Sequence, residues 1–148
     1  MMIERLRVPD QLRTPDRLGA SGVTLAVVLA LVTANAIYGW VGLMADGFGM
    51  PDAWLERMPL HSWEFGAWAL LLTVAVPQAV AFILVIRRHA LAGVVGFLAG
   101  AALVAWILVQ LAILQRYFFL QPVIAGFGIV EMLLAWFWTR PARARTDS

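Results

Sequence analysis

The residues of this chain that could do chemistry are polar side chains set inside long apolar segments. Each of four such segments carries one polar group in the same half, and these are Asn35, Glu64, Gln110 and Gln121. On helices that rise 1.5 Å per residue, the last three lie ~6 Å and Asn35 ~13 Å below one membrane boundary. His61 and Arg116 lie just above them. Polar groups in lipid usually face a bundle interior or a cavity, so we expect a polar pocket in one leaflet.

Aromatic side chains share helix faces with these polar groups. At 100° per residue, the second span should carry one stripe of His61, Glu64, Trp68 and Gln78. In the third span Trp106 shares a face with Gln110. A few polar groups in an apolar lining are typical of a pocket for an amphipathic, lipid-like molecule. The expected ligand-binding residues are Asn35, His61, Glu64, Trp68, Trp106, Gln110, Arg116 and Gln121. The alternative is a hydrogen-bond cluster between helices that holds no ligand.

Two pairings within this set are specific enough to predict. Glu64 and Arg116 should form an ion pair or share a polar ligand, because a carboxylate in lipid needs a partner. His61 and Glu64 lie three residues apart and could act as acid and base in a small enzyme for a lipid or quinone. They are too few to specify a metal site, and the chain has no cysteine. We expect no metal and no cofactor, and favour a non-enzymatic protein.

A second polar pair lies deeper. Glu131 is ~21 Å from the same boundary, close to the level of Gln78. Burial favours the neutral acid there, and we expect it to hydrogen-bond to Gln78 or to a backbone carbonyl. A proton relay through Glu131 is the alternative interpretation.

The elements that must position these residues are transmembrane helices. Of 148 residues, 62% are hydrophobic and 14% are charged, whereas about a quarter of the residues of soluble domains are charged. Crossing a hydrocarbon core takes ~20 helical residues. The predicted spans are 18–45, 60–86, 90–114 and 117–138, with a short interfacial turn at 51–58. The chain is therefore predicted to be all-α, a single membrane domain over 1–148.

Arginine placement predicts the orientation. Nine of the eleven arginines fall in the two tails and in the segment after the second span, and these are Arg5, Arg7, Arg13, Arg17, Arg87, Arg88, Arg140, Arg143 and Arg145. The positive-inside rule then places both termini in the cytoplasm and makes the bundle antiparallel, with its polar pocket in the outer leaflet. We interpret the basic tails as topology signals that touch anionic lipid, with no nucleic-acid partner.

Small residues and prolines predict how the helices pack. Ala92, Gly96 and Gly100 recur every four residues, which lets another helix approach closely. That helix could belong to the same bundle, to a second copy or to a larger complex that this chain stabilises as an accessory subunit. Pro77 should kink its helix near Thr73. Pro122 either kinks the fourth span or is the first residue of a helix that starts there, which would leave 115–121 as an aromatic interfacial segment.

The segment Trp106-Ile107-Leu108-Val109-Gln110, followed by 115–122 (QRYFFLQP), resembles small uncharacterised bacterial membrane proteins with four helices. The four-span plan is also similar to the DoxX-like group in architecture alone. The resemblance implies a multi-pass protein of the bacterial cytoplasmic membrane, and it brings no activity or catalytic residue with it.

Overall fold

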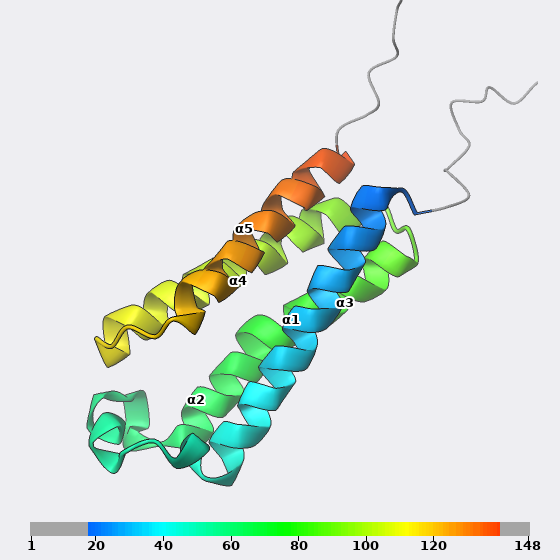
Figure 1. Ribbon diagram of the computed structural model, residues 1–148. Helices are drawn as coiled ribbons and strands as arrows, with labels where there is room; N and C mark the ends of the chain where they lie inside the picture. The colour runs from blue at the N-terminus through cyan, green and yellow to red at the C-terminus, as the bar shows by residue number, and fades with distance from the viewer. Residues whose placement is uncertain (1–17, 140–148) are drawn as a thin grey trace, which may run out of the picture.

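The computed structural model describes residues 18–139 and consists of helices joined by short segments (Figure 1). Its helices are α1 (Ala20–Ala45), α2 (Trp63–Leu70), α3 (Val76–Ile86), α4 (Ala92–Leu114) and α5 (Leu120–Thr139). The π-helical turn η5 (Leu71–Ala75) joins α2 and α3 into a single span. Each of the four spans is long and apolar enough to cross a membrane. The chain is therefore a helical, multi-pass membrane protein. The arginines of both tails lie outside the described residues.

The segment between α1 and α2 has structure of its own. It contains three short 3₁₀ helices, η2 (Gly47–Gly49), η3 (Asp52–Arg57) and η4 (Pro59–His61). Pro51 and Pro59 flank η3, as expected for the predicted turn at 51–58, because proline suits a helix start and cannot continue a helix. Arg57 Nη1 donates to the backbone oxygen of Leu114 at 3.1 Å, which ties this segment to the end of α4.

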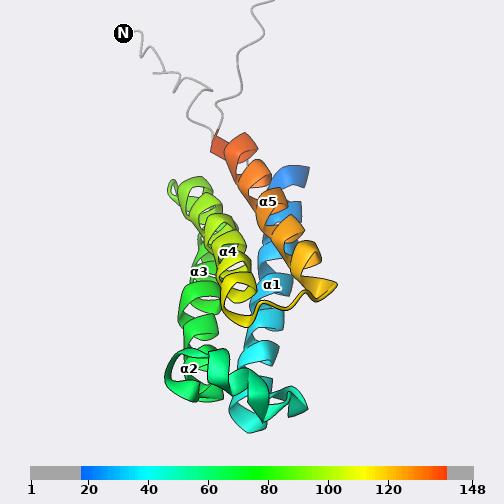
Figure 2. The same ribbon diagram turned by 90° about the vertical axis from the view of Figure 1, so that its left-hand side faces the viewer.

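The four spans come together at one end of the molecule and separate at the other (Figures 1 and 2). We call the half that holds Ala20, Ile86, Ala92 and Thr139 the closed end. The half that holds Ala45, Trp63, Leu114 and Leu120 is the open end. All seven buried residues of α1 lie between Gly22 and Ala36, so none belongs to its last two turns, which lie in the open end. The core therefore lies in the closed end and the middle of the bundle.

Small residues allow α4 and α5 to pack closely there. A Cβ added to Gly100 would come within 2.6 Å of the backbone oxygen of Gly128, so the two helix backbones touch. Gly96 faces Ala135 of α5 and Leu25 of α1, and Ala92 is buried in the same core. The small-residue stripe of α4 therefore packs inside this bundle, which is the internal one of the alternatives drawn from the sequence.

The span that contains Pro77 departs from α-helical geometry one turn before the proline. Pro77 has no N–H to donate, and the N–H of Val76 bonds to Leu71, five residues back. Thr73, where a kink was predicted, lies in this π turn. A π turn changes the helical register, so Glu64 and Trp68 do not share a face with Gln78. The prediction that they form one stripe is wrong: Trp68 is 49% exposed and Gln78 is fully buried.

The second interpretation of Pro122 is the nearer one, although the helix begins two residues earlier than predicted. α5 begins at Leu120, so Pro122 lies in its first turn, where a missing N–H costs no helical bond. α4 ends at Leu114, and the left-handed backbone of its C-cap Gln115 (φ 50°) turns the chain out of the helix. Residues 116–119 then cross from α4 to α5 as a short aromatic segment.

Candidate functional site: a cavity at the open end

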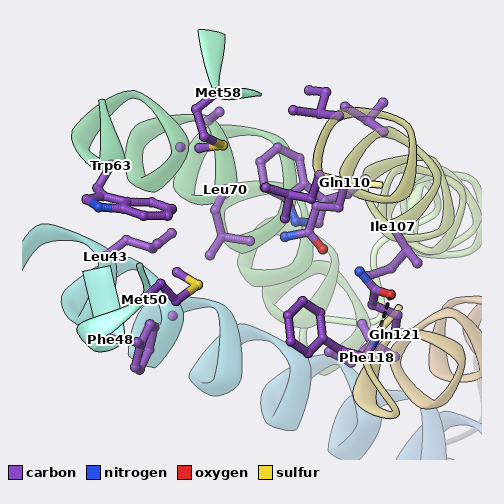
Figure 3. Close-up of a pocket in the computed structure, with 18 of the residues that line it drawn as sticks. Leu43, Phe48, Met50, Met58, Trp63, Leu70, Ile107, Gln110, Phe118 and Gln121 are labelled. Atoms are coloured by element: carbon purple, nitrogen blue, oxygen red, sulfur yellow. Dashed lines mark hydrogen bonds between the residues drawn. The ribbon is translucent and has the colours of Figure 1, made fainter. Parts of the chain in front are cut away.

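A cavity of about 860 Å³ lies where the spans separate. One wall comes from α1, α2 and the segment between them, including Leu43, Met58 and Leu70. The other wall comes from α4 and the start of α5, including Ile107 and Gln110 (Figure 3). Pockets for small organic ligands span ~300 to 1,000 Å³, so this cavity has room for one such molecule.

The walls of the cavity are almost wholly apolar and rich in large, adaptable side chains. The aromatic and methionine residues that line it are Phe48, Met50, Met58, Trp63, Phe65, Trp106, Phe118 and Phe119. Methionine and aromatic side chains fit irregular apolar ligands well. No Asp, Glu, Lys, Arg or His lines the cavity within the described residues. Such a site favours a hydrocarbon chain or ring over an ion.

Two side-chain amides reach the cavity, and they differ in what they bond. The Oε1 of Gln121 accepts the backbone N–H of Phe118 at 3.0 Å, which fixes the aromatic segment before α5. Gln110 forms no hydrogen bond to any described residue, and its amide points toward the middle of the cavity (Figure 3). Gln110 is therefore the group available to bond a polar atom of a ligand.

The structure brings three of the eight expected ligand-binding residues to the cavity: Trp106, Gln110 and Gln121. The other five, Asn35, His61, Glu64, Trp68 and Arg116, do not line it and are exposed on the protein surface. His61 has a left-handed backbone (φ 48°) and lies before α2, which begins after its N-cap Ser62. The ring of Trp68 packs edge-on against Trp40, 5.8 Å between centroids.

Glu64 and Arg116 form no ion pair in the described part of the chain, and neither side chain lines the cavity. The arginine that reaches the end of α4 is Arg57, through its bond to Leu114. Within residues 18–139, no three His, Asp or Glu side chains gather as metal ligands would.

Several residues that line the cavity belong to the segment before α2. The sequence alone did not assign them to a site. Phe48 and Leu60 have left-handed backbones (φ 59° and 62°), so this segment folds back on itself. A Cβ on Gly66 would meet the Met58 side chain at 2.6 Å, which shows how closely the segment lies on α2. One sequence feature could have identified this wall of the cavity: Met50 and Met58 each stand directly before a proline.

The deeper polar pair lies apart from the cavity. Gln78 of α3 and Glu131 of α5 are both fully buried, and Gln78 Nε2 donates to Glu131 Oε2 at 2.7 Å. The same nitrogen lies 3.4 Å from the backbone oxygen of Ala99 in α4. The pair thus links three helices where they pack most closely.

Comparison with protein-family models, with curated proteins and with solved structures finds no match for this chain. Its function is therefore argued from the site alone.

Proposed function

We propose that this protein binds an amphipathic, lipid-like molecule in the cavity at the open end. The observation that supports the proposal is the cavity itself. Its apolar walls lie between α1 and α2 on one side and α4 and α5 on the other, whereas the closed end is closely packed. A hydrocarbon chain in an apolar volume of this size gains dispersion contacts with the lining, so such an occupant would be favourable.

The lining indicates how such a molecule would lie. Its apolar part would occupy the space between Leu70 and Trp106, and a carbonyl or hydroxyl group would bond to Gln110. A charged headgroup would stay outside, because no charged side chain lines the cavity in the described residues. Arg116 lies between two lining residues, Leu114 and Phe118, in the sequence, and could meet that headgroup at the rim.

The proposal includes an orientation of the protein in the membrane. We infer an antiparallel bundle with both termini in the cytoplasm and the open end in the outer leaflet of the bacterial cytoplasmic membrane. Arg87 and Arg88 follow α3 at the closed end, which supports this orientation under the positive-inside rule.

Filling the cavity tests the proposal. Ala69 lines it, so Ala69→Phe should exclude the ligand, whereas Ala34→Phe adds the same ring on an exposed position of α1 outside the cavity. We expect native mass spectrometry of purified protein to show a retained molecule in the wild type and in Ala34→Phe. Its occupancy should fall at least about tenfold in Ala69→Phe, a loss of ~1.4 kcal/mol or more.

Two results would contradict the proposal. One is a wild-type protein that carries no small molecule but a stoichiometric protein partner, which would favour the accessory-subunit function. The other is equal occupancy in both phenylalanine variants, which would place any bound lipid outside the cavity.

A further inference from the structure

The fully buried pair of Gln78 and Glu131 has a hydrogen-bonding deficit that no described residue fills. Gln78 has two N–H donors on Nε2, and this nitrogen serves Glu131 Oε2 and the backbone oxygen of Ala99. Gln78 Oε1 and Glu131 Oε1 are both buried and have no partner. These two acceptor oxygens therefore have no donor among the described residues. Buried polar atoms almost always have a partner, so the pair is unusual.

Within the described residues, the helices packed around Glu131 offer no opposite charge to an ionised carboxylate. The elements that surround it are α1, α3, α4 and α5, and their sequences contain no Lys, Arg or His and no other Asp or Glu. The only other side chain in them with an ionisable proton is Tyr38, which is 68% exposed. A buried charge without a partner is strongly unfavourable, so the surroundings offer a carboxylate nothing that would keep it ionised.

We propose that the Gln78–Glu131 pair is a binding site for one proton. The proton is carried by Glu131 Oε1 and donated to Gln78 Oε1, while Gln78 Nε2 donates to Glu131 Oε2. This carboxylic acid–carboxamide ring gives each of the unpaired oxygens a partner and leaves the pair without net charge. Gly100 makes room for it, since a Cβ there would come within 3.0 Å of Glu131 Cβ.

The site is independent of the cavity. Gln78, Ala99 and Glu131 do not line it, and the pair lies in the closely packed part of the bundle. Its only ligand is the proton, and the two side chains supply the whole of the site.

Infrared spectroscopy of the whole protein tests the proposal. At about pH 8, water-exposed Asp and Glu are ionised, so a protonated carboxyl is visible by its carbonyl stretch, which lies above that of a carboxylate. The sample is protein in dodecyl maltoside, which has no carbonyl group. We expect the acid band in the wild type and in Glu64→Gln, whose carboxyl is exposed, and its loss in Glu131→Gln.

Glu131→Gln should fold normally, because its amide supplies the donor that Gln78 Oε1 needs. In Gln78→Leu the acid band should move to higher frequency, since the carboxyl loses its amide partner. A wild-type spectrum with no acid band would overturn the proposal and would indicate a carboxylate held by water or a cation. An acid band that survives in Glu131→Gln would overturn it as well.

Discussion

The closed end and the open end are built from the same apolar class of residue, but they differ in residue size. Five of the eight buried residues in the closed-end cluster are alanine, and Gly96 and Gly100 lie beside them. The walls of the open end carry four phenylalanines, two methionines and two tryptophans, and these are Phe48, Met50, Met58, Trp63, Phe65, Trp106, Phe118 and Phe119. Helices in lipid approach closely only where side chains are small, since hydrophobicity gives no preference for protein over lipid. Side-chain size therefore decides where this bundle closes and where it holds a cavity.

Enlarging a small residue at the closed end should give the largest effect. In Gly100→Ala the new Cβ would come within 2.6 Å of the Gly128 backbone oxygen, so α4 and α5 must separate. Overpacking of this kind costs about 1 to 3 kcal/mol, and we expect the upper part of that range because backbone cannot yield as a side chain can. Thermal unfolding in detergent measures the loss.

Gly126→Ala is the matched control for that variant. Gly126 lies in α5, and a Cβ there meets nothing within 4 Å. This substitution should leave stability unchanged or raise it by up to ~1 kcal/mol, because alanine favours the helix. Equal destabilisation by both variants would show that the close α4–α5 contact does not set the packing of the closed end.

A smaller effect is expected from the one free amide at the open end. Gln110→Leu keeps the cavity apolar but removes its only unbonded side-chain amide among the described residues. A retained molecule that bonds to Gln110 should bind about tenfold more weakly, equivalent to ~1.4 kcal/mol, as native mass spectrometry across a detergent titration would measure. Asn35→Leu removes an exposed amide outside the cavity and should change nothing. Unchanged binding in Gln110→Leu would mean that the ligand is held by apolar contact alone.

The smallest effect is expected at the bond that ties the segment before α2 to α4. Arg57→Ala removes the 3.1 Å hydrogen bond to the backbone oxygen of Leu114. Because this bond is exposed, its loss should lower the free energy of unfolding by less than ~1 kcal/mol. Hydrogen exchange of η3 should nevertheless become faster, because this is the only side-chain hydrogen bond between η3 and α4 among the described residues. Arg116→Ala, which removes no hydrogen bond to a described residue, should leave exchange in η3 unchanged. Equal exchange in both variants would contradict a role for Arg57 in holding this wall of the cavity.

The helices could be predicted because their signals are local. Long segments without charged residues predicted the four spans. Pro77 predicted a kink at Thr73, where the structure has a π turn. Equal depth brought Gln78 and Glu131 together, and they are in contact. Of the residues expected around a pocket, Trp106 and Gln110 line the cavity, whereas Glu64 and Trp68 do not.

The failure of the predicted stripe along the second span has a physical cause. Helical periodicity assumes one register along the span, and the π turn changes that register between Trp68 and Gln78. Likewise, the rule that polar groups face inward failed at Asn35 and Glu64, which are exposed on the protein surface. The separation of the helices at the open end could not be predicted from the positions of polar residues, because it depends on the sizes of the side chains that meet across the bundle.

A structure determined in lipid nanodiscs tests the central claim most directly. The account predicts elongated density between Leu70 and Trp106, in contact with the Gln110 amide, while α4 and α5 remain packed at Gly100 and Gly128. A cavity closed by direct packing of α2 against α4, or one that holds only water, would contradict it.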